Sequence, residues 1–253
     1  MEFLRSATRE RGVYYLSEYA DAFESLYLSV REQEDRVLSD ELVLKLPQTP
    51  KAFRWHREWN TRIHNFHRIT AYVELRAFQS ALDLGCGNGW FTARLRNQVP
   101  KVLGLDMNRP ELEQACRLFT ASNLEFAFAD VFEAPLPLGH FDLITLNASV
   151  QYFPDFKALI HRLFELLAPE GEIHILDSQW YDPEKVRKAK LRSAAYYQSV
   201  GTPEMIEFYH HRVWSDLEGL AWDKLYEPKG FLSKIKRKWG RESMFPWIRI
   251  RKT

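Results

Sequence analysis

Short apolar runs that end in a polar residue recur along the middle of the chain. The first covers residues 81–84 and carries one acid, Asp83, as a buried parallel strand with a polar group would. Four more runs follow, at residues 101–106, 124–130, 141–147 and 171–177. Helical patterns separate several of these runs. Strands that alternate with helices predict an α/β fold with a doubly wound, mostly parallel sheet.

A glycine-rich turn follows the first run, with the sequence GCGNG at residues 85–89. Glycines let a ligand approach the backbone, and the start of the next helix offers free N–H donors and a positive dipole end. The spacing is G-x-G-x-G, whereas dinucleotide-binding enzymes use G-x-G-x-x-G. That difference, together with the acid after the third run, counts against a dehydrogenase.

The flanking sequence divides the chain into three predicted segments. Residues 1–50 carry an apolar helical face and end in the breaker-rich sequence LPQTP, which suggests an N-terminal helical cap. Residues 51–180 form the ligand-binding core and open with a long helix at about 57–77. Residues 181–253 are expected to form a lid of two helices, 185–197 and 203–211, followed by strands at 221–227 and 245–251.

Over residues 55–178 the chain resembles the class I S-adenosylmethionine (SAM)-dependent methyltransferases. DLGCGNGW, LGLDMN, FADVFEAPL, FDLITLNASVQYF and LLAPEGEIHILD match the family's motifs in the family's order. The resemblance implies a Rossmann-like, seven-stranded sheet with one antiparallel strand, in which the last two strands form a hairpin. It also implies SAM as the cofactor.

The resemblance also assigns roles to acids at the strand ends. Asp106 would accept hydrogen bonds from the ribose hydroxyls, and Asp130 would accept one from the adenine amine, with the Val131 N–H as a donor to a ring nitrogen. The turn would hold the methionyl group, and Asp83 would face the sulfonium. The expected cofactor-binding residues are Asp83, Gly85, Cys86, Gly87, Asn88, Gly89, Asp106, Met107, Asp130, Val131 and Asn147.

The acceptor site is less defined by the motifs. In this family the residues after the fourth strand lie beside the reactive methyl group, and many members that act on small molecules have histidines there. This chain has Gln151 and Tyr152 instead. His210 or His211 would then be a candidate general base near neutral pH. The expected catalytic residues are His210, His211, Gln151 and Tyr152, and the expected substrate-binding residues are Tyr15, Tyr196 and Tyr197.

Composition narrows the possible partners. The 253 residues carry a formal net charge of +1, so no overall attraction to nucleic acid is expected. The N-terminus lacks a signal-peptide pattern, and no apolar run is long enough for a membrane span, which favours a cytoplasmic protein. No metal-ligand spacing is present, so no metal is predicted. A basic cluster, Lys234, Lys236, Arg237 and Lys238, suggests a solvated loop or a site for an anionic partner.

The leading hypothesis is an enzyme that transfers a methyl group to O or N of a small organic acceptor. Aromatic residues make up 14% of the chain, and many lie outside the core. Aromatic rings suit organic molecules and the C–H faces of sugars, so a sugar or a secondary metabolite is a possible acceptor. The alternatives are a methyltransferase acting on RNA or protein, and a SAM-binding protein without transfer activity. The sequence leaves the oligomeric state open.

Overall fold

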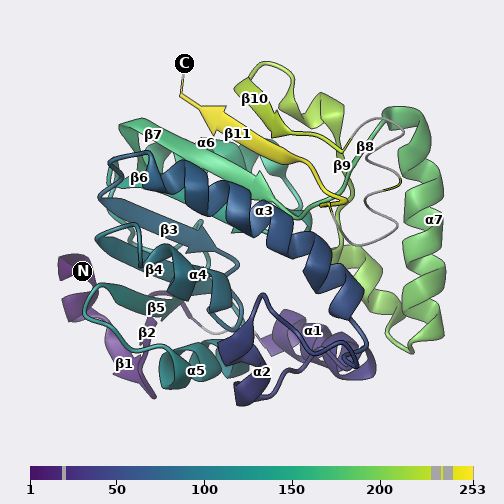
Figure 1. Ribbon diagram of the computed structural model, residues 1–253, viewed down its shortest axis with the longest axis horizontal. Coiled ribbons are helices and arrows are strands. Elements are labelled where there is room, and N and C mark those ends of the chain that lie inside the picture. Colours follow the sequence, from purple (N-terminus) through teal and green to yellow (C-terminus); the bar gives the residue numbers. More distant parts are fainter. Residues whose placement is uncertain (19–20, 229–234, 236–241, 253) are drawn as a thin grey trace.

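The computed structural model describes residues 1–18, 21–228, 235 and 242–252. These residues form a nine-stranded sheet in the order β1-β2-β5-β4-β3-β6-β7-β11-β10, flanked by helices (Figure 1). The strands of this sheet are β1 (Thr8–Glu10), β2 (Val13–Tyr15), β3 (Ser80–Leu84), β4 (Lys101–Asp106), β5 (Leu124–Phe128), β6 (Phe141–Asn147), β7 (Leu167–Leu176), β10 (Ala221–Tyr226) and β11 (Trp247–Arg251). The α-helices are α1 (Asp21–Gln33), α2 (Asp40–Lys45), α3 (His56–Glu74), α4 (Trp90–Leu95), α5 (Arg109–Leu118), α6 (Phe156–Leu166) and α7 (Pro183–Ser199).

The mostly parallel, doubly wound sheet predicted from the sequence is confirmed. Strands β5, β4, β3, β6 and β7 are parallel, and β11 enters antiparallel between β7 and β10. These strands and β10 make up the expected seven. The final hairpin, β10–β11, is the predicted one.

An N-terminal hairpin extends the sheet by two strands beyond the expected seven. Strand β2 pairs in parallel with β5, and β1 pairs antiparallel with β2. A turn at Arg11 and Gly12, both with positive φ, joins the two strands. Each strand has three residues, too few for an alternating pattern to stand out, so the prediction of a helical cap at residues 1–50 did not include them.

The segment after β7 also differs in part from the prediction. Helix α7 matches the expected helix, but residues 203–208 form a 3-10 helix, η3 (Pro203–Phe208), and the chain beyond is extended. There β9 (Arg212–Val213) pairs with β8 (Trp180–Tyr181). The basic cluster of Lys234, Lys236, Arg237 and Lys238 lies outside the described residues, apart from the single position 235 within it. In the part of the chain that the structure describes, no helix has both the length and the apolar character of a membrane span.

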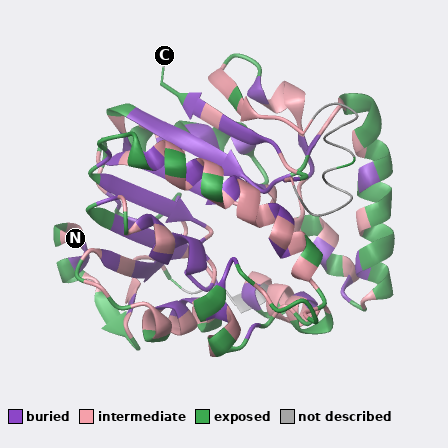
Figure 2. Cartoon of the chain, in the orientation of Figure 1, coloured by how far each residue is buried: buried purple, intermediate pink, exposed green. Residues whose placement is uncertain are grey.

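Side chains of the central strands alternate between two cores, one on each face of the sheet. Ala81 and Val102 pack in the core under α3, α4 and α5, whereas Leu82 and Leu103 pack in the core with α6. The central strands of the sheet are almost entirely buried, whereas the edge strands β1 and β10 are not (Figure 2). Because helices cover both faces of the sheet, a ligand has to bind at an edge. Open α/β sheets bind ligands at the carboxyl ends of their strands.

Asp83 is a charged residue within this core. It is 1% exposed, and its carboxylate accepts hydrogen bonds from Thr92 Oγ1 at 2.6 Å and Thr145 Oγ1 at 2.8 Å. Burial raises the pKa of Asp83 to about 6, and the two hydroxyl groups oppose this increase only in part. Asp83 thus ties α4 and β6 to β3.

The raised pKa of Asp83 makes stability depend on pH. Because the pKa of about 6 in the folded state lies above the value of about 3.9 for an unfolded chain, the protonated group stabilises the fold below about pH 4. This contribution, of order 1–3 kcal/mol, is lost as the pH rises through about 6. We expect Asp83→Asn, which cannot ionise, to gain stability relative to wild type between about pH 4 and about pH 7. Urea unfolding at both pH values measures this, and a constant difference would contradict the assignment.

Candidate active site

The glycine turn between β3 and α4 has an unusual backbone. Gly85, Gly87 and Gly89 have φ of 76°, 51° and 72°, a region that favours glycine. A Cβ on Gly85 would lie 2.3 Å from the Cβ of Ser149, which is too close for any side chain. The turn is therefore a cradle of bare backbone pressed against the loop after β6.

Asp106, at the end of β4, holds this turn in place. Its carboxylate accepts hydrogen bonds from the backbone N–H groups of Gly87 at 2.7 Å, Met107 at 2.8 Å and Asn108 at 2.9 Å. Burial, and then the neighbouring Glu111, raise the pKa of Asp106 to about 7, although the three N–H groups oppose the increase.

The next strand end is covered by the N-terminal segment. The Asp130 N–H donates to Ser17 Oγ at 2.9 Å, and its carboxylate accepts from the Phe132 N–H at 2.9 Å. Val131 is buried in the core. Further along, Glu24 of α1 accepts a hydrogen bond from the Arg109 N–H at 2.6 Å. Helix α1 and the chain before it thus lie over the edge where adenosine is expected.

A cavity of about 480 Å³ opens beside the turn, at the carboxyl ends of β3, β6 and β7. Its walls come from all three predicted segments of the chain: from α1 and α3, from the strand ends, and from α7 and η3. Of the expected cofactor residues, those that line it are Gly85, Cys86, Gly87, Asn88 and Asn147.

Six expected cofactor residues are not among the lining residues of this cavity: Asp83, Gly89, Asp106, Met107, Asp130 and Val131. Asp83 is tied to two threonines, as described above, and the structure gives it a place in the core. The thiol of Cys86 is buried, and burial raises its pKa well above the usual value, so it is no nucleophile.

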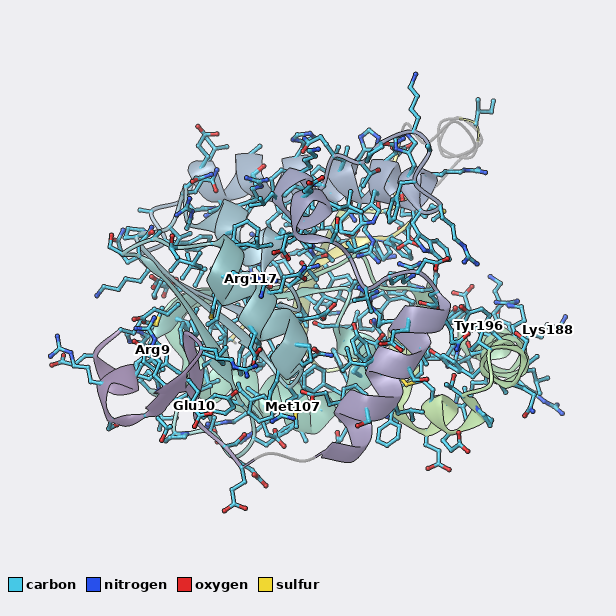
Figure 3. The ribbon with its side chains drawn as sticks, turned by 90° about the horizontal axis from the view of Figure 1, so that it is seen from below. Arg9, Glu10, Met107, Arg117, Lys188 and Tyr196 are labelled. Carbon is cyan, nitrogen blue, oxygen red and sulfur yellow. The ribbon has the colours of Figure 1, made fainter. Side chains whose placement is uncertain are left out.

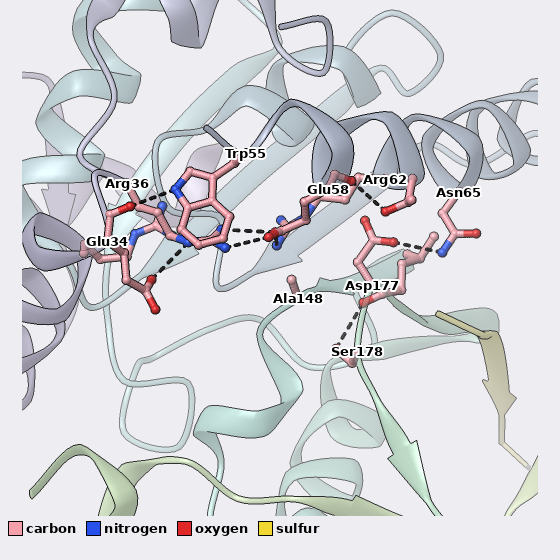
Figure 4. A network of polar contacts seen from close by, with 12 residues as sticks. Glu34, Arg36, Trp55, Glu58, Arg62, Asn65, Ala148, Asp177 and Ser178 are labelled. Atoms are coloured by element: carbon pink, nitrogen blue, oxygen red, sulfur yellow. Dashed lines mark hydrogen bonds and ion pairs between the residues drawn. The ribbon is translucent and has the colours of Figure 1, made fainter. Parts of the chain in front are cut away.

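One wall of the cavity is a network of arginines and glutamates (Figure 4). Arg36 contacts Glu34 at 3.0 Å, donates to Glu58, and lies 3.8 Å from the centre of the Trp55 ring. Arg62 contacts Glu58 at 2.8 Å. Burial alone would raise the pKa of Glu58, but Arg62 and Arg36 hold it at about 2. Glu58 is therefore ionised at any physiological pH and remains paired with Arg36 and Arg62.

The expected acceptor residues are divided between this cavity and other places. Gln151, Tyr152, Tyr196 and Tyr197 line the cavity. Tyr196 lies on the side of α7 that faces the rest of the molecule, where its hydroxyl donates to Glu34, whereas Lys188 points outward (Figure 3). Four of the acceptor-site residues predicted from the sequence therefore lie at the cavity.

Three candidates lie elsewhere. Tyr15, on β2, stacks on Phe128 with ring centres 5.6 Å apart. His211 lies 2.9 Å from Ser193 Oγ and contacts the Tyr209 ring, and it lines a separate pocket of about 680 Å³. Burial lowers the pKa of His211. The His210 backbone N–H donates to the carbonyl of Gln151 at 2.7 Å, but its side chain does not line the cavity.

Several lining residues were missed by the sequence analysis, among them Arg31, Arg36, Glu58, Arg62 and Asp177. The first four lie outside the family's motifs, where nothing in the sequence distinguishes them from surface charges. Asp177 did carry a signal, because it ends the fifth apolar run as Asp106 ends the second.

The residues fit SAM at three points. The turn offers bare backbone for the methionyl group, and Asp106 offers a half-buried carboxylate at the end of the neighbouring strand. Asn147 Oδ1 is buried, lines the cavity, and has no hydrogen-bond partner among the described residues, so it can accept one from a ligand. No group of three or more possible metal ligands occurs in the described part of the chain.

Comparison with known proteins agrees with this geometry. The family described as "Methyltransferase domain" matches residues 81–171. An uncharacterized methyltransferase of Mycobacterium tuberculosis is 33% identical over 118 residues, which are 47% of this chain and 59% of that protein. The trans-aconitate 2-methyltransferase of Variovorax paradoxus is 30% identical over 169 residues, which cover 64% of this chain and 62% of the relative. This chain thus spans about three fifths of the length of these curated relatives.

Solved structures show the same fold. The YcgJ protein of Bacillus subtilis has a TM-score of 0.57 at 15% identity, covering 76% of this chain and 99% of that one. A SAM-dependent methyltransferase from Mesorhizobium loti has a TM-score of 0.54 at 19% identity, covering 78% of this chain and 98% of that one. Residues 81–171 thus match a methyltransferase domain, and the fold is the one found in SAM-dependent methyltransferases, whose cofactor is SAM.

The close contact at Gly85 gives a direct test of the cradle. A methyl group on Gly85 would collide with Ser149 and displace the turn, so we expect Gly85→Ala to weaken binding of S-adenosylhomocysteine by about tenfold or more. Gly139→Ala is the matched control, because Gly139 also has a positive φ, 61°, but no atom within 4 Å of an added Cβ. Titration calorimetry on both variants gives the comparison. Equal affinities would show that the turn does not hold the cofactor.

Proposed function

We propose that this protein transfers the methyl group of SAM to an oxygen or nitrogen atom of a small organic molecule. The observation that carries the proposal is the shared cavity: residues of the cofactor turn and of α7 and η3 line the same space. Its volume of about 480 Å³ lies within the range of small-molecule sites, roughly 300–1,000 Å³. SAM supplies an electrophilic methyl group when bound, and the protein has to orient the acceptor and exclude water.

The lining of the cavity suits a polar organic acceptor. Tyr152, Tyr197 and Tyr209 contribute aromatic surface, and arginines contribute hydrogen-bond donors. The relatives named trans-aconitate 2-methyltransferase support an acceptor of small size. A sugar or a secondary metabolite is compatible with this lining, since ring faces stack on the C–H surfaces of sugars.

An anionic macromolecule is the second candidate acceptor. The observation in its favour is the exposed basic side of α7, whose cations include Arg187, Lys188, Lys190 and Arg192. Arg192 also lines the cavity. If RNA were bound there, the affinity would fall steeply with salt.

The test is to incubate the protein with SAM that carries a deuterated methyl group. One sample receives a small-molecule extract, a second total RNA, and a third a protein lysate cleared of small molecules. We expect mass spectrometry to detect a deuterated-methyl product in the first sample, with an equal amount of S-adenosylhomocysteine. Gly85→Ala should reduce the product, and Gly139→Ala should not.

Other outcomes would replace the proposal. A label found only in RNA or protein would indicate a macromolecular acceptor. Binding of SAM without any product in the three samples would indicate a SAM-binding protein without transfer activity.

A further inference from the structure

Asp177 is the first residue after β7, at the same edge of the sheet as the cofactor turn. Strands β6 and β7 are in register there, with Asn147 opposite Leu176, and the Ala148 N–H donates to the Leu176 carbonyl at 2.9 Å. Asp177 and Ala148 therefore lie side by side, and both line the cavity together with Gly85. In the methyltransferases that this chain resembles, the loop after β6 lies beside the reactive methyl group. Asp177 is thus one strand away from that loop.

The backbone is strained at both residues. Asp177 has a φ of 48° and Ala148 a φ of 58°, values that are uncommon for residues other than glycine. Neither has the freedom of glycine, so the surrounding structure has to hold each of them in place. Such residues cluster at active sites. At Asp177 this conformation directs a carboxylate into the lining of the cavity.

Asp177 is held by one side chain. It is 6% exposed, and Oδ1 accepts a hydrogen bond from Asn65 Nδ2 at 2.9 Å (Figure 4). Asn65 is fully buried, and its own Oδ1 accepts from Arg68 at 3.2 Å. Among the described residues, no partner contacts the second carboxylate oxygen. One oxygen is therefore oriented and the other is available to a ligand.

The other carboxylates in the cavity lining are neutralised by arginines. Glu34 lies 3.0 Å from Arg36, Glu58 lies 2.8 Å from Arg62, and Glu111 lies 3.4 Å from Arg31. Within the described residues Asp177 has no arginine or lysine inside ion-pair distance. It is the lining carboxylate that can accept a proton without breaking an ion pair.

The charges around Asp177 set the range in which it titrates. Burial raises its pKa to about 6, whereas Arg62 and the bond from Asn65 lower it. Glu58, also on α3, raises the pKa of Asp177 as burial does, and Arg68 lowers it. Charges on the other elements that line the cavity are two ion pairs and one arginine on α7: Glu34 with Arg36, Glu111 with Arg31, and Arg192. Asp177 is therefore largely ionised at neutral pH but within reach of protonation.

We propose that Asp177 is the general base for the acceptor, and that the acceptor is a small molecule with a reacting hydroxyl group, an alcohol or a phenol. The inference rests on the proposed function and narrows it to O-methylation. A neutral amine could react without a base, whereas a hydroxyl has to lose its proton as it attacks. His210 and His211 cannot take this role in the observed arrangement, since neither lines the cavity.

The reaction is balanced with the groups named here. The hydroxyl oxygen forms a bond to the methyl carbon as the carbon–sulfur bond breaks, and the sulfur keeps that electron pair. The hydroxyl proton passes to the free oxygen of Asp177. The products are a methyl ether and S-adenosylhomocysteine, and Asp177 later releases its proton to solvent.

The test compares Asp177→Asn with Asp182→Asn, which makes the same change five residues further on, at a partly exposed acid that pairs with Lys185. Rates are measured with deuterated-methyl SAM and the acceptor found in the small-molecule extract. We expect the rate of Asp177→Asn to fall about 10²–10⁴-fold, with an affinity for S-adenosylhomocysteine within about threefold of wild type. Asp182→Asn should match wild type in both. The wild-type rate should fall about tenfold per pH unit below about pH 6, because the base is then protonated, and Asp177→Asn should lose this dependence.

A second variant separates chemistry from structure. Asp177→Gly suits the positive φ and leaves space beside Asn65, so added formate should restore part of its rate. A structural role for Asp177 would give no such rescue.

Three outcomes would overturn the inference: a rate for Asp177→Asn within about threefold of wild type, a product methylated on nitrogen, or a loss confined to S-adenosylhomocysteine affinity. The last would make Asp177 a ligand of the methionyl amine. A wild-type protein that methylates no small molecule would instead refute the proposed function, and this inference with it.

Discussion

The close approach of the turn after β3 to the loop after β6 is the constraint on which the site depends. Ser149 donates to the Leu84 carbonyl at 2.6 Å, and its Cβ occupies the space where any side chain at position 85 would begin. The two strand ends are thereby locked together, with Asn147 and the bare turn on the same side. Asp106 fixes the turn from the other side through the Gly87 N–H. A ligand at this edge therefore meets a preformed surface rather than one it has to organise.

The cavity is completed by helices that flank the strand ends. Helix α1 covers the edge near Asp106, α3 supplies the wall of paired charges, and α7 closes the far side with Tyr196 and Tyr197. Tyr196 bonds to Glu34, which joins α7 to the end of α1. Within one fold, such flanking helices can set the acceptor specificity, while the strand ends bind the cofactor. The charged residues on these helices are therefore the ones to vary when acceptor choice is studied.

Much of the core could be predicted from the sequence, because glycine spacing and acids at strand ends report directly on backbone geometry. The same signals could not tell which acid faces a ligand. Asp83 and Asp106 both belong to apolar strands, yet Asp83 lies one position before the strand end and points to Thr92 and Thr145 instead. Asp177 is the last residue of the apolar run 171–177, just as Asp106 is the last residue of the run 101–106, but the resemblance assigned Asp177 no role. The flanks were predicted less well, because His211 was placed on a helix although η3 ends at Phe208 and the following residues are extended. The arginines of the charged wall, Arg36 and Arg62, both form ion pairs with Glu58, and the pair with Arg36 joins α3 to the chain just after α1. A local sequence pattern cannot predict contacts between such distant segments.

We expect one cavity, at the ends of β3, β6 and β7, to hold both the methionyl end of the cofactor and the acceptor. A crystal structure with S-adenosylhomocysteine would show whether it does. The ribose hydroxyls should lie on Asp106, the amino-acid part over the turn at Gly85 and Gly87, and the sulfur should face the space between Gln151 and Asp177. A sulfur atom that faces away from this space, or a ligand bound in another pocket, would contradict it.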